Sequence, residues 1–300
     1  MDSFISPSVA IVLLNWNNYN DTAECLYSLQ NLDYSNYHIY VADNGSTDGS
    51  AERLAEEFPW CEVIFNNENL GFAAGNNRAI DQALEQGFDY ILLLNNDTIV
   101  KPDFLKPLVK TGERYDDVVI VGGVIRDEAE NVWSAGGSFK SWTLRLEHET
   151  SPSTSEYETR FVSGAMMLID AAFLKGVGGL NESYFFGMED EEIAWLARQQ
   201  ENRLMINPKS QIQHKVGQSS SEHSPFRYYH DARNRLAFAT KNLPIQRRLF
   251  FYLFFTVTRM LRFVEWTFKG KVELIYATIV GVVDWLWNKP FRRVDQFGGI

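Results

Sequence analysis

The stretch Gly87–Ile99, GFDYILLLNNDTI, joins an apolar run to an abrupt polar end. Tyr90–Leu94 has no helical periodicity, which predicts a short and fully buried strand. The run stops at Asn95-Asn96-Asp97, at the carboxyl edge of a sheet, where open α/β folds bind ligands. Asp97 can offer an oxygen ligand to Mg²⁺ or Mn²⁺, with substrate phosphates completing the shell. Asn and Asp are also ordinary turn residues, so a polar turn explains this segment alone equally well.

Strand and helix patterns alternate along the first hundred residues. The strands expected before residue 90 are 9–14, 38–42 and 63–65, and the helices are 21–30, 50–58 and 78–86. Such alternation predicts an α/β fold with a mostly parallel central sheet covered by helices. Later in the chain we expect strands at 118–123 and 161–169, and helices at 171–175, 193–200 and 226–241.

Composition narrows the class of protein. With 45% hydrophobic residues the chain can bury a core, and its net charge of −11 argues against a nucleic-acid-binding protein. Cys25 and Cys61 are too few for a disulfide framework and are not spaced as metal ligands. The amino-terminal segment MDSFISPSVAIVLLNW lacks a basic region and a cleavage site, so we expect a cytoplasmic protein.

The carboxyl-terminal segment has a different charge from the rest. Residues 246–293 contain nine Lys/Arg and three Asp/Glu, so this segment is +6 and the remainder is −17. Its two uncharged apolar runs, 249–258 and 274–283, are about half as long as a membrane-spanning helix requires. Basic residues beside aromatic faces predict helices that lie on an anionic membrane surface. Helices that pack on the domain or in a homodimer are the alternative.

Two loops carry candidate ligand-binding or catalytic groups. Asn69–Asn77 contains Gly71 and Gly75 but matches neither GxGxxG nor GxxxxGK[ST], and a tight strand-to-helix connection is its simpler interpretation. Four consecutive acids, Glu189–Glu192, begin a helix and suit its macrodipole. They follow an aromatic loop, so one of these carboxylates could also act as a general base.

Two basic groups further along are ambiguous by themselves. A lone histidine such as His214 is more often structural than a ligand. Arg233 and Arg235 could clamp a phosphate or pair with the acidic body.

Taken together, these segments resemble the family 2 glycosyltransferases of the GT-A fold, and within them the bacterial rhamnosyltransferase-like branch. The matching pieces lie within residues 8–240 and read, in order, VAIVLLNWNN, VADNGSTDGS, NLGFAAGNNRAI, YILLLNNDTIV, FVSGAMMLI, FFGMEDEEIAWLAR, HKVGQSS and YYHDARNRLAF. The resemblance implies a nucleotide-sugar donor and inversion at the anomeric carbon. We therefore expect a GT-A domain over residues 1–242 and a helical membrane-associating extension over 243–300.

The resemblance also implies roles for individual positions. The implied donor-binding residues are Asn15, Asn17, Asp43, Gly71, Asn77, Asn95 and Asn96. Asp97 and His214 would hold Mg²⁺ or Mn²⁺, and Asn95 replaces the first acid of the family's DxD motif, a departure found in this branch as NND. The implied catalytic base is Asp190, in a pair with Glu189. The implied acceptor-binding residues are Ser163, Gly164, Arg233 and Asn234.

These residue types suit glycosyl transfer. A divalent cation can neutralise the charge that develops on a departing nucleoside diphosphate. One carboxylate must take the proton of the acceptor hydroxyl, and a single displacement needs no second carboxylate as nucleophile. The expected function is thus metal-dependent inverting transfer in cell-surface polysaccharide synthesis at the inner face of the cell membrane. The donor would be dTDP-L-rhamnose, or alternatively a UDP-sugar, and the acceptor a lipid-linked glycan.

Two other classes of protein remain as alternatives. The first is a non-catalytic nucleotide-sugar-binding or scaffold protein, against which the presence of Asp97, Asp190 and His214 counts. The second is a dinucleotide-dependent dehydrogenase, which is disfavoured because no GxGxxG follows the first strand.

Overall fold

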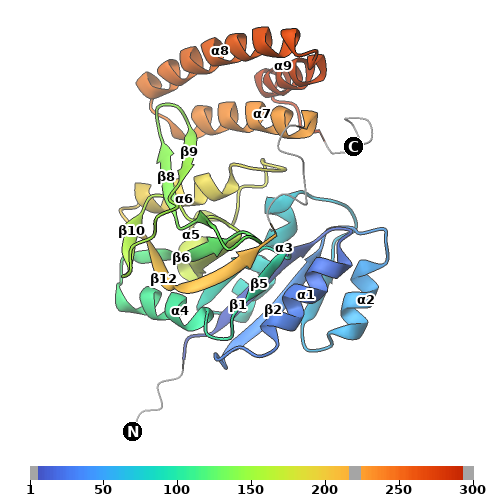
Figure 1. Cartoon of the computed structure of the whole chain (residues 1–300), viewed down its shortest axis with the longest axis vertical. Coiled ribbons are helices and arrows are strands. Elements are labelled where there is room, and N and C mark those ends of the chain that lie inside the picture. The colour runs from blue at the N-terminus through green and yellow to red at the C-terminus, as the bar shows by residue number, and fades with distance from the viewer. Residues whose placement is uncertain (1–5, 216–223, 293–300) are drawn as a thin grey trace.

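The computed structural model describes residues 6–215 and 224–292, and its centre is a ten-stranded sheet with the order β10-β12-β6-β11-β4-β1-β2-β3 (Figure 1). Off this path, β5 pairs with β12 and β7 pairs with β6. The strands are β1 Val9–Asn15, β2 Tyr37–Asp43, β3 Glu62–Phe65, β4 Tyr90–Leu94, β5 Thr98–Val100, β6 Val118–Arg126, β7 Val132–Ser134, β10 Tyr157–Thr159, β11 Met166–Asp170 and β12 Arg203–His214. Residues 1–5, the part of the HKVGQSS motif after Lys215, and Arg293 lie outside the described ranges.

The sheet is parallel in its first half and mixed in its second. Strands β3, β2, β1 and β4 are parallel neighbours, which confirms the α/β prediction for this part of the chain. Strand β11 then runs antiparallel between β4 and β6, with Met166 opposite Leu94. The strand expected at 161–169 begins only at Met166, because the preceding residues turn and the Met166 N–H donates to the Ser163 carbonyl at 3.1 Å.

Helices cover both faces of the sheet, and alternate residues of the central strands divide the core accordingly. On one face, Ile11 and Leu92 pack with α1 Tyr19–Leu29, α2 Ser50–Glu57 and α4 Leu105–Arg114. On the other face, Val12 and Leu93 pack with α3 Phe72–Gln86, α5 Ala171–Val177 and α6 Glu189–Gln199. Helix α3 begins at Phe72 rather than 78, so most of the glycine-containing segment is helix and the strand-to-helix interpretation holds.

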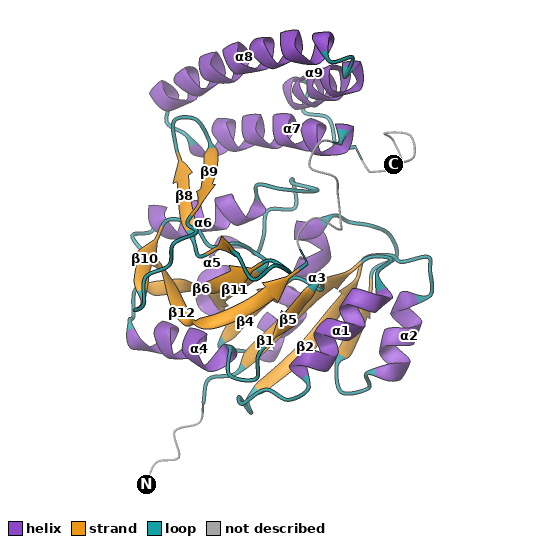
Figure 2. Cartoon of the chain, in the orientation of Figure 1, coloured by secondary structure: helices purple, strands orange, loops and turns teal. Residues whose placement is uncertain are grey.

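Three further helices, α7 Pro225–Asn242, α8 Ile245–Phe268 and α9 Val272–Leu286, form a layer beyond α6 (Figure 2). A hairpin of β8 Gly137–Lys140 and β9 Arg145–His148 reaches up to α8, where the Trp142 and Phe250 rings lie 5.3 Å apart. Helix α8 is a continuous 24-residue helix that contains the whole apolar run 249–258, and Arg259 within it pairs with Asp231 of α7. None of the helices in the described ranges has the length and apolar character that crossing a bilayer requires.

Candidate active site

The carboxyl ends of β4 and β12 place an acid beside an imidazole. Strand β12 pairs with β5 so that His214 lies opposite Thr98, directly after Asp97. His214 Nε2 is 3.0 Å from Asp97 Oδ1 and 3.2 Å from Asn95 Nδ2. Both Asp97 and His214 are buried, and the Trp133 ring packs edge-on against the imidazole at 5.4 Å. The structure therefore brings together the two residues that the sequence assigned to metal binding.

This pair fits a divalent cation whose remaining ligands come from the substrate. A carboxylate oxygen and an imidazole nitrogen suit Mn²⁺ or Mg²⁺. Within residues 6–215 and 224–292, no group of three or more His, Cys, Asp or Glu side chains gathers as a metal site. A cation held by Asp97 and His214 would thus need further oxygen ligands from a diphosphate or water.

A buried polar network lies next to this pair and connects four of the elements at the sheet edge. The Asn15 Nδ2 group donates to Asp43 Oδ1 at 2.7 Å and to Ser50 Oγ at 2.9 Å. Thr22 Oγ1 donates to Asn15 Oδ1 at 2.8 Å and accepts from Asn96 Nδ2 at 2.7 Å. Three of the predicted donor-binding residues, Asn15, Asp43 and Asn96, thereby belong to one network.

Sequence reasoning missed Thr22, which links the two ends of this network. It is fully buried in the first turns of α1, and its position after Asn18 and Asp21 looks like ordinary helix-start chemistry. Asn17 lies at the rim instead, exposed and with a positive φ of 50°, and its N–H donates to Ser46 Oγ at 2.8 Å. Ser46 also donates to Asp43, so Asn17 joins the network indirectly.

Asp190, the predicted catalytic base, is bound by the backbone of Gly164. Asp190 Oδ2 accepts from the Gly164 N–H at 2.7 Å, and its buried Oδ1 has no hydrogen-bond partner in the described residues. A Cβ on Gly164 would lie 2.4 Å from that oxygen, so this approach requires glycine. The next residue, Ala165, accepts from the Asn95 N–H at 3.2 Å, which connects the Asp190 carboxylate to the end of β4.

Burial governs the protonation of these acids. It raises the pKa of Asp190 to about 6, an effect that the Gly164 hydrogen bond opposes. Burial and then the nearby Asp190 charge hold the pKa of Glu189 well above its ordinary value. Glu189 therefore keeps its proton more firmly than Asp190, and Asp190 is the member of the pair that can be an unprotonated carboxylate near neutral pH.

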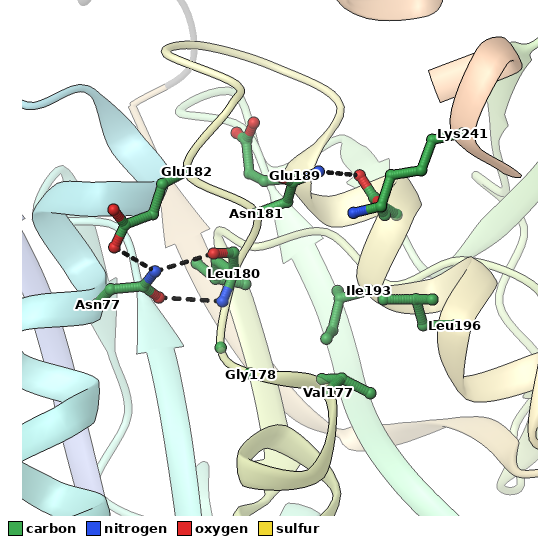
Figure 3. Close-up of a pocket in the computed structure, with 12 residues that line it drawn as sticks. Asn77, Val177, Gly178, Leu180, Asn181, Glu182, Glu189, Ile193, Leu196 and Lys241 are labelled. Atoms are coloured by element: carbon green, nitrogen blue, oxygen red, sulfur yellow. Dashed lines mark hydrogen bonds and ion pairs between the residues drawn. The ribbon is translucent and has the colours of Figure 1, made fainter. Parts of the chain in front are cut away.

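Gly71 and Asn77 lie apart from the Asn15–Asp43 network and support the loop before α6. Gly71 has a φ of 85° and accepts the close approach of Phe185, whose carbonyl receives the Phe72 N–H at 2.8 Å. The Asn77 amide binds both the carbonyl and the N–H of Leu180, at 2.8 and 3.0 Å (Figure 3). Gly71 and Asn77, which we expected to bind the donor, thus contact other residues of the protein in this structure.

Asn77 also lines a cavity of about 260 Å³ on the side of α6 formed by Glu189, Glu192, Ile193 and Leu196 (Figure 3). The Lys241 ammonium lies 2.8 Å from Glu192 Oε1, and Asn181 Nδ2 donates to Glu192 Oε2 at 2.7 Å. Lys241 therefore pairs with Glu192, one of three glutamates that line this cavity, and neither Asp97 nor His214 lines it.

The predicted acceptor-binding residues divide into two groups. Ser163 is buried beside Gly164, and its Oγ accepts from the Ala165 N–H at 3.3 Å. Arg233 and Asn234 instead hold the loop before α6: Arg233 Nη1 donates to the Ser183 carbonyl, and Asn234 Nδ2 to those of Phe186 and Gly187, each at 3.0 Å. Ser163 and Gly164 thus lie beside the candidate base, while Arg233 and Asn234 face the loop that precedes it.

A mixed sheet of this topology, with an acid and an imidazole at the carboxyl end of its central strands, defines a glycosyltransferase of the GT-A fold. The chain belongs to glycosyl transferase family 2, whose family model matches residues 8–178. The family and fold class predicted from the motifs are confirmed by this match.

Several characterised proteins are similar to this chain over most of its length. It is 23% identical to the dTDP-rhamnosyl transferase RfbF of Shigella flexneri, over 89% of this chain and 92% of the relative. It is 24% identical to the N-acetylglucosaminyl-diphospho-decaprenol L-rhamnosyltransferase of Mycobacterium tuberculosis, over 62% of this chain and 70% of the relative. The crystal structure of GalNAc-T7 with UDP, GalNAc and Mn²⁺ superposes with a TM-score of 0.63 and 16% identity, over 84% of this chain and 56% of that one.

Proposed function

We propose that this glycosyltransferase moves L-rhamnose from dTDP-L-rhamnose onto a lipid-linked glycan, with inversion and with the help of Mg²⁺ or Mn²⁺. The observation that carries the proposal is the edge where Asp97, His214 and Asp190 converge around β4. Asp97 and His214 would supply a cation's protein ligands. Asp190 would supply the base, and it is linked to Asn95 through the backbone of Gly164 and Ala165. A bound cation would neutralise the charge on the leaving diphosphate.

The chain's own residues account for the remaining steps. The network around Asn15 and Asp43 would bind the base and ribose of the nucleotide, because it presents amide and carboxylate groups held in fixed orientation. Asp190 would take the proton of the acceptor hydroxyl on its Oδ1, which has no other partner among the described residues. With Glu189 protonated, only one carboxylate of the pair is charged, which suits a single displacement.

The choice of donor and acceptor rests on the relatives. Two of them are named as rhamnosyltransferases, one for dTDP-rhamnose and one for a sugar-diphospho-lipid. A UDP-sugar is the second candidate donor, because the GalNAc-T7 structure with the same fold holds UDP.

We further propose that residues 243–300 bind the cytoplasmic face of an anionic membrane. Apolar side chains at helical spacing form an exposed stripe on α8, namely Leu249, Leu253, Val257, Met260, Leu261, Val264 and Phe268. A second stripe on α9 consists of Val272, Tyr276, Ile279 and Val283. Stripes of this extent are unusual on a free protein surface, and the +6 charge of the segment favours anionic lipid over a second copy of this acidic chain.

The deciding experiment is a panel of nucleotide sugars with Mn²⁺ or Mg²⁺, with an N-acetylglucosaminyl-diphospho-lipid as acceptor, scored for nucleoside diphosphate release. We expect dTDP-L-rhamnose to give the largest acceptor-dependent release. Release from a UDP-sugar alone would transfer the assignment to the second donor. An absence of acceptor-dependent release for every donor would contradict the proposed function with this acceptor.

A further inference from the structure

The carboxyl-terminal segment 288–292 returns from α9 to the loop that precedes the candidate base. This loop, residues 183–188, leads directly into Glu189 and Asp190 at the start of α6. Arg233 joins the two segments: its Nη1 donates to the Ser183 carbonyl at 3.0 Å and its Nη2 donates to the Lys289 carbonyl at 3.2 Å. A single guanidinium therefore bridges the loop and the end of the described chain.

Aromatic packing makes a second connection between the same two segments. The Phe291 ring lies 5.1 Å from the Phe185 ring, and the Arg233 guanidinium lies 5.9 Å from the Phe291 ring. On its other side Phe185 stacks on His230 at 5.5 Å, with the planes 21° apart. Phe185 is thus enclosed by two rings from α7, His230 and Phe226, and by one ring from segment 288–292.

Segment 288–292 is itself fixed to α7 and α9. Arg292 Nε lies 2.8 Å from the buried Asp284 Oδ2, which also accepts from the Tyr229 hydroxyl at 3.1 Å. The Arg292 N–H donates to the Tyr229 hydroxyl at 3.0 Å, and the Arg292 carbonyl is 3.1 Å from His230 Nε2. Burial lowers the pKa of His230 to about 3, so this imidazole stays neutral and its Nε2–H can donate. The segment is therefore held near both of its ends, at Lys289 and at Arg292.

The loop is also held by hydrogen bonds from Asn234 to the Phe186 and Gly187 carbonyls and from the Phe72 N–H to the Phe185 carbonyl, and its backbone before α6 is unusual. Gly187 and Met188 both adopt positive φ values, 81° and 84°, and Met188 is the residue before α6. Such a backbone persists only where its surroundings determine it. A shift of Met188 would move the first turn of α6, and with it the Asp190 carboxylate that faces Gly164.

We infer that Phe291 and Arg233 are positioning residues for catalysis. Segment 288–292 is then a part of the active-site scaffold as well as of the helical layer. The inference rests on the proposed role of Asp190 as the base. Neither residue touches the reacting atoms: they act through loop 183–188. Removing the Phe291 ring should loosen the loop and misplace the base without changing the Asn15–Asp43 network.

Hydrogen exchange of the full-length protein tests the structural half of this inference without relying on activity. In Phe291→Ala we expect amides of residues 183–188 to exchange at least about tenfold faster, while those of β1 and β4 stay protected. Phe268→Ala is the control, because it removes the same kind of ring from a position at the end of α8 that is 88% exposed. Unchanged exchange of the loop in Phe291→Ala would overturn the inference.

Kinetics test the catalytic half. Turnover should fall by about 10²-fold in Phe291→Ala and in Arg233→Lys, which keeps the charge but loses the bridging fork. Affinity for dTDP with Mn²⁺ should change by less than about twofold, and Phe291→Tyr should restore turnover. Faster loop exchange with unchanged turnover would overturn the positioning role. If the parent shows no transfer while loop exchange still responds to Phe291→Ala, the proposed function fails but the connection between the segments stands.

Discussion

His214 Nε2 and Asp97 Oδ1 lie 3.0 Å apart, at the ends of two strands that are remote in sequence. The pairing of β12 with β5 creates this contact, because it brings His214 opposite the residue that follows Asp97. A carboxylate and an imidazole so close together are ligand types that one divalent cation can share.

Asp97→Ala should weaken the Mn²⁺-dependent binding of a nucleoside diphosphate by at least about tenfold and abolish turnover, since the site would lose the carboxylate that lies beside His214. Titration calorimetry of dTDP with and without Mn²⁺ measures the effect. Asp103→Ala, which removes an exposed acid a few residues further on, is the control. Equal dTDP affinity in Asp97→Ala and the parent with Mn²⁺ present would refute the metal assignment.

Asp190→Asn keeps the shape of the side chain but removes the proton acceptor, so turnover should drop by about 10²-fold or more with donor affinity retained. Glu189→Gln should have a much smaller effect, because the raised pKa of Glu189 already keeps that carboxyl protonated. Steady-state kinetics of the two variants side by side decide between the neighbours. An inactive Glu189→Gln beside an active Asp190→Asn would reverse the assignment.

The pH dependence of stability should reveal Asp190 as well. Its pKa in the folded protein is raised from 3.8 to about 6, so its contribution to stability is complete below pH 3.8 and is lost as pH rises through 6. Asp190→Asn should therefore be more stable than the parent at pH 8, by ~1–3 kcal/mol, and this gain should shrink toward pH 4. Urea unfolding at both pH values measures it, and a less stable variant at pH 8 would contradict the raised pKa.

Thr22→Val should reduce donor affinity and stability together. The valine has nearly the same shape, but it leaves the buried Asn15 and the half-buried Asn96 without a shared partner, at a cost of about 1–3 kcal/mol. Thr22→Ser retains the hydroxyl and serves as the control. Thermal unfolding and dTDP calorimetry on the three proteins test this, and parent-like values for both in Thr22→Val would show that the network is unimportant.

Flotation with liposomes tests the membrane proposal. The full-length protein should float with vesicles containing anionic lipid at low salt, and binding should fall with salt without vanishing, because only the charge contribution is screened. Leu253→Glu with Leu261→Glu should abolish flotation, since both side chains lie on the exposed stripe of α8. Ala172→Glu with Lys175→Glu, on exposed positions of α5, controls for added acid. Full-length protein that stays at the bottom of a low-salt gradient would refute membrane binding.

Local sequence patterns predicted the parallel part of the fold well, because β1, β2 and β4 are buried on both faces and read as apolar runs. They failed where long-range pairing decides the structure. Met166–Asp170 could be recognised as a strand, but its antiparallel position between β4 and β6 depends on residues far away in sequence. The apolar run 249–258 marks only part of α8, which extends from Ile245 to Phe268 and whose Arg259 pairs with Asp231 of α7.

The residues of the candidate site divide in the same way, into those that local sequence predicts and those that depend on long-range contacts. Asn15 and Asp43 end their strands, Asp97 lies in the turn after β4 and Asp190 begins a helix, and sequence motifs are informative at such positions. Thr22 carries no such signal, because its importance comes from two partners on other strands. Asn77 and Arg233 have suggestive residue types, but the structure shows their hydrogen bonds spent on the loop before α6.

The β8–β9 hairpin acts as a spacer between the sheet and α8. Its tip meets α8 through Trp142 and Phe250, and its turn is tied to α7 by the hydrogen bond from Arg235 to the Thr143 carbonyl at 2.6 Å. The hairpin therefore helps to set the height of α8 above the sheet, directly through Phe250 and indirectly through α7. With α8 on a bilayer, the active site would be held at a fixed distance from the lipid. The enzyme would then reach only acceptors whose glycan extends that far from the membrane. Shortening the hairpin should then shift the preferred length of the acceptor glycan.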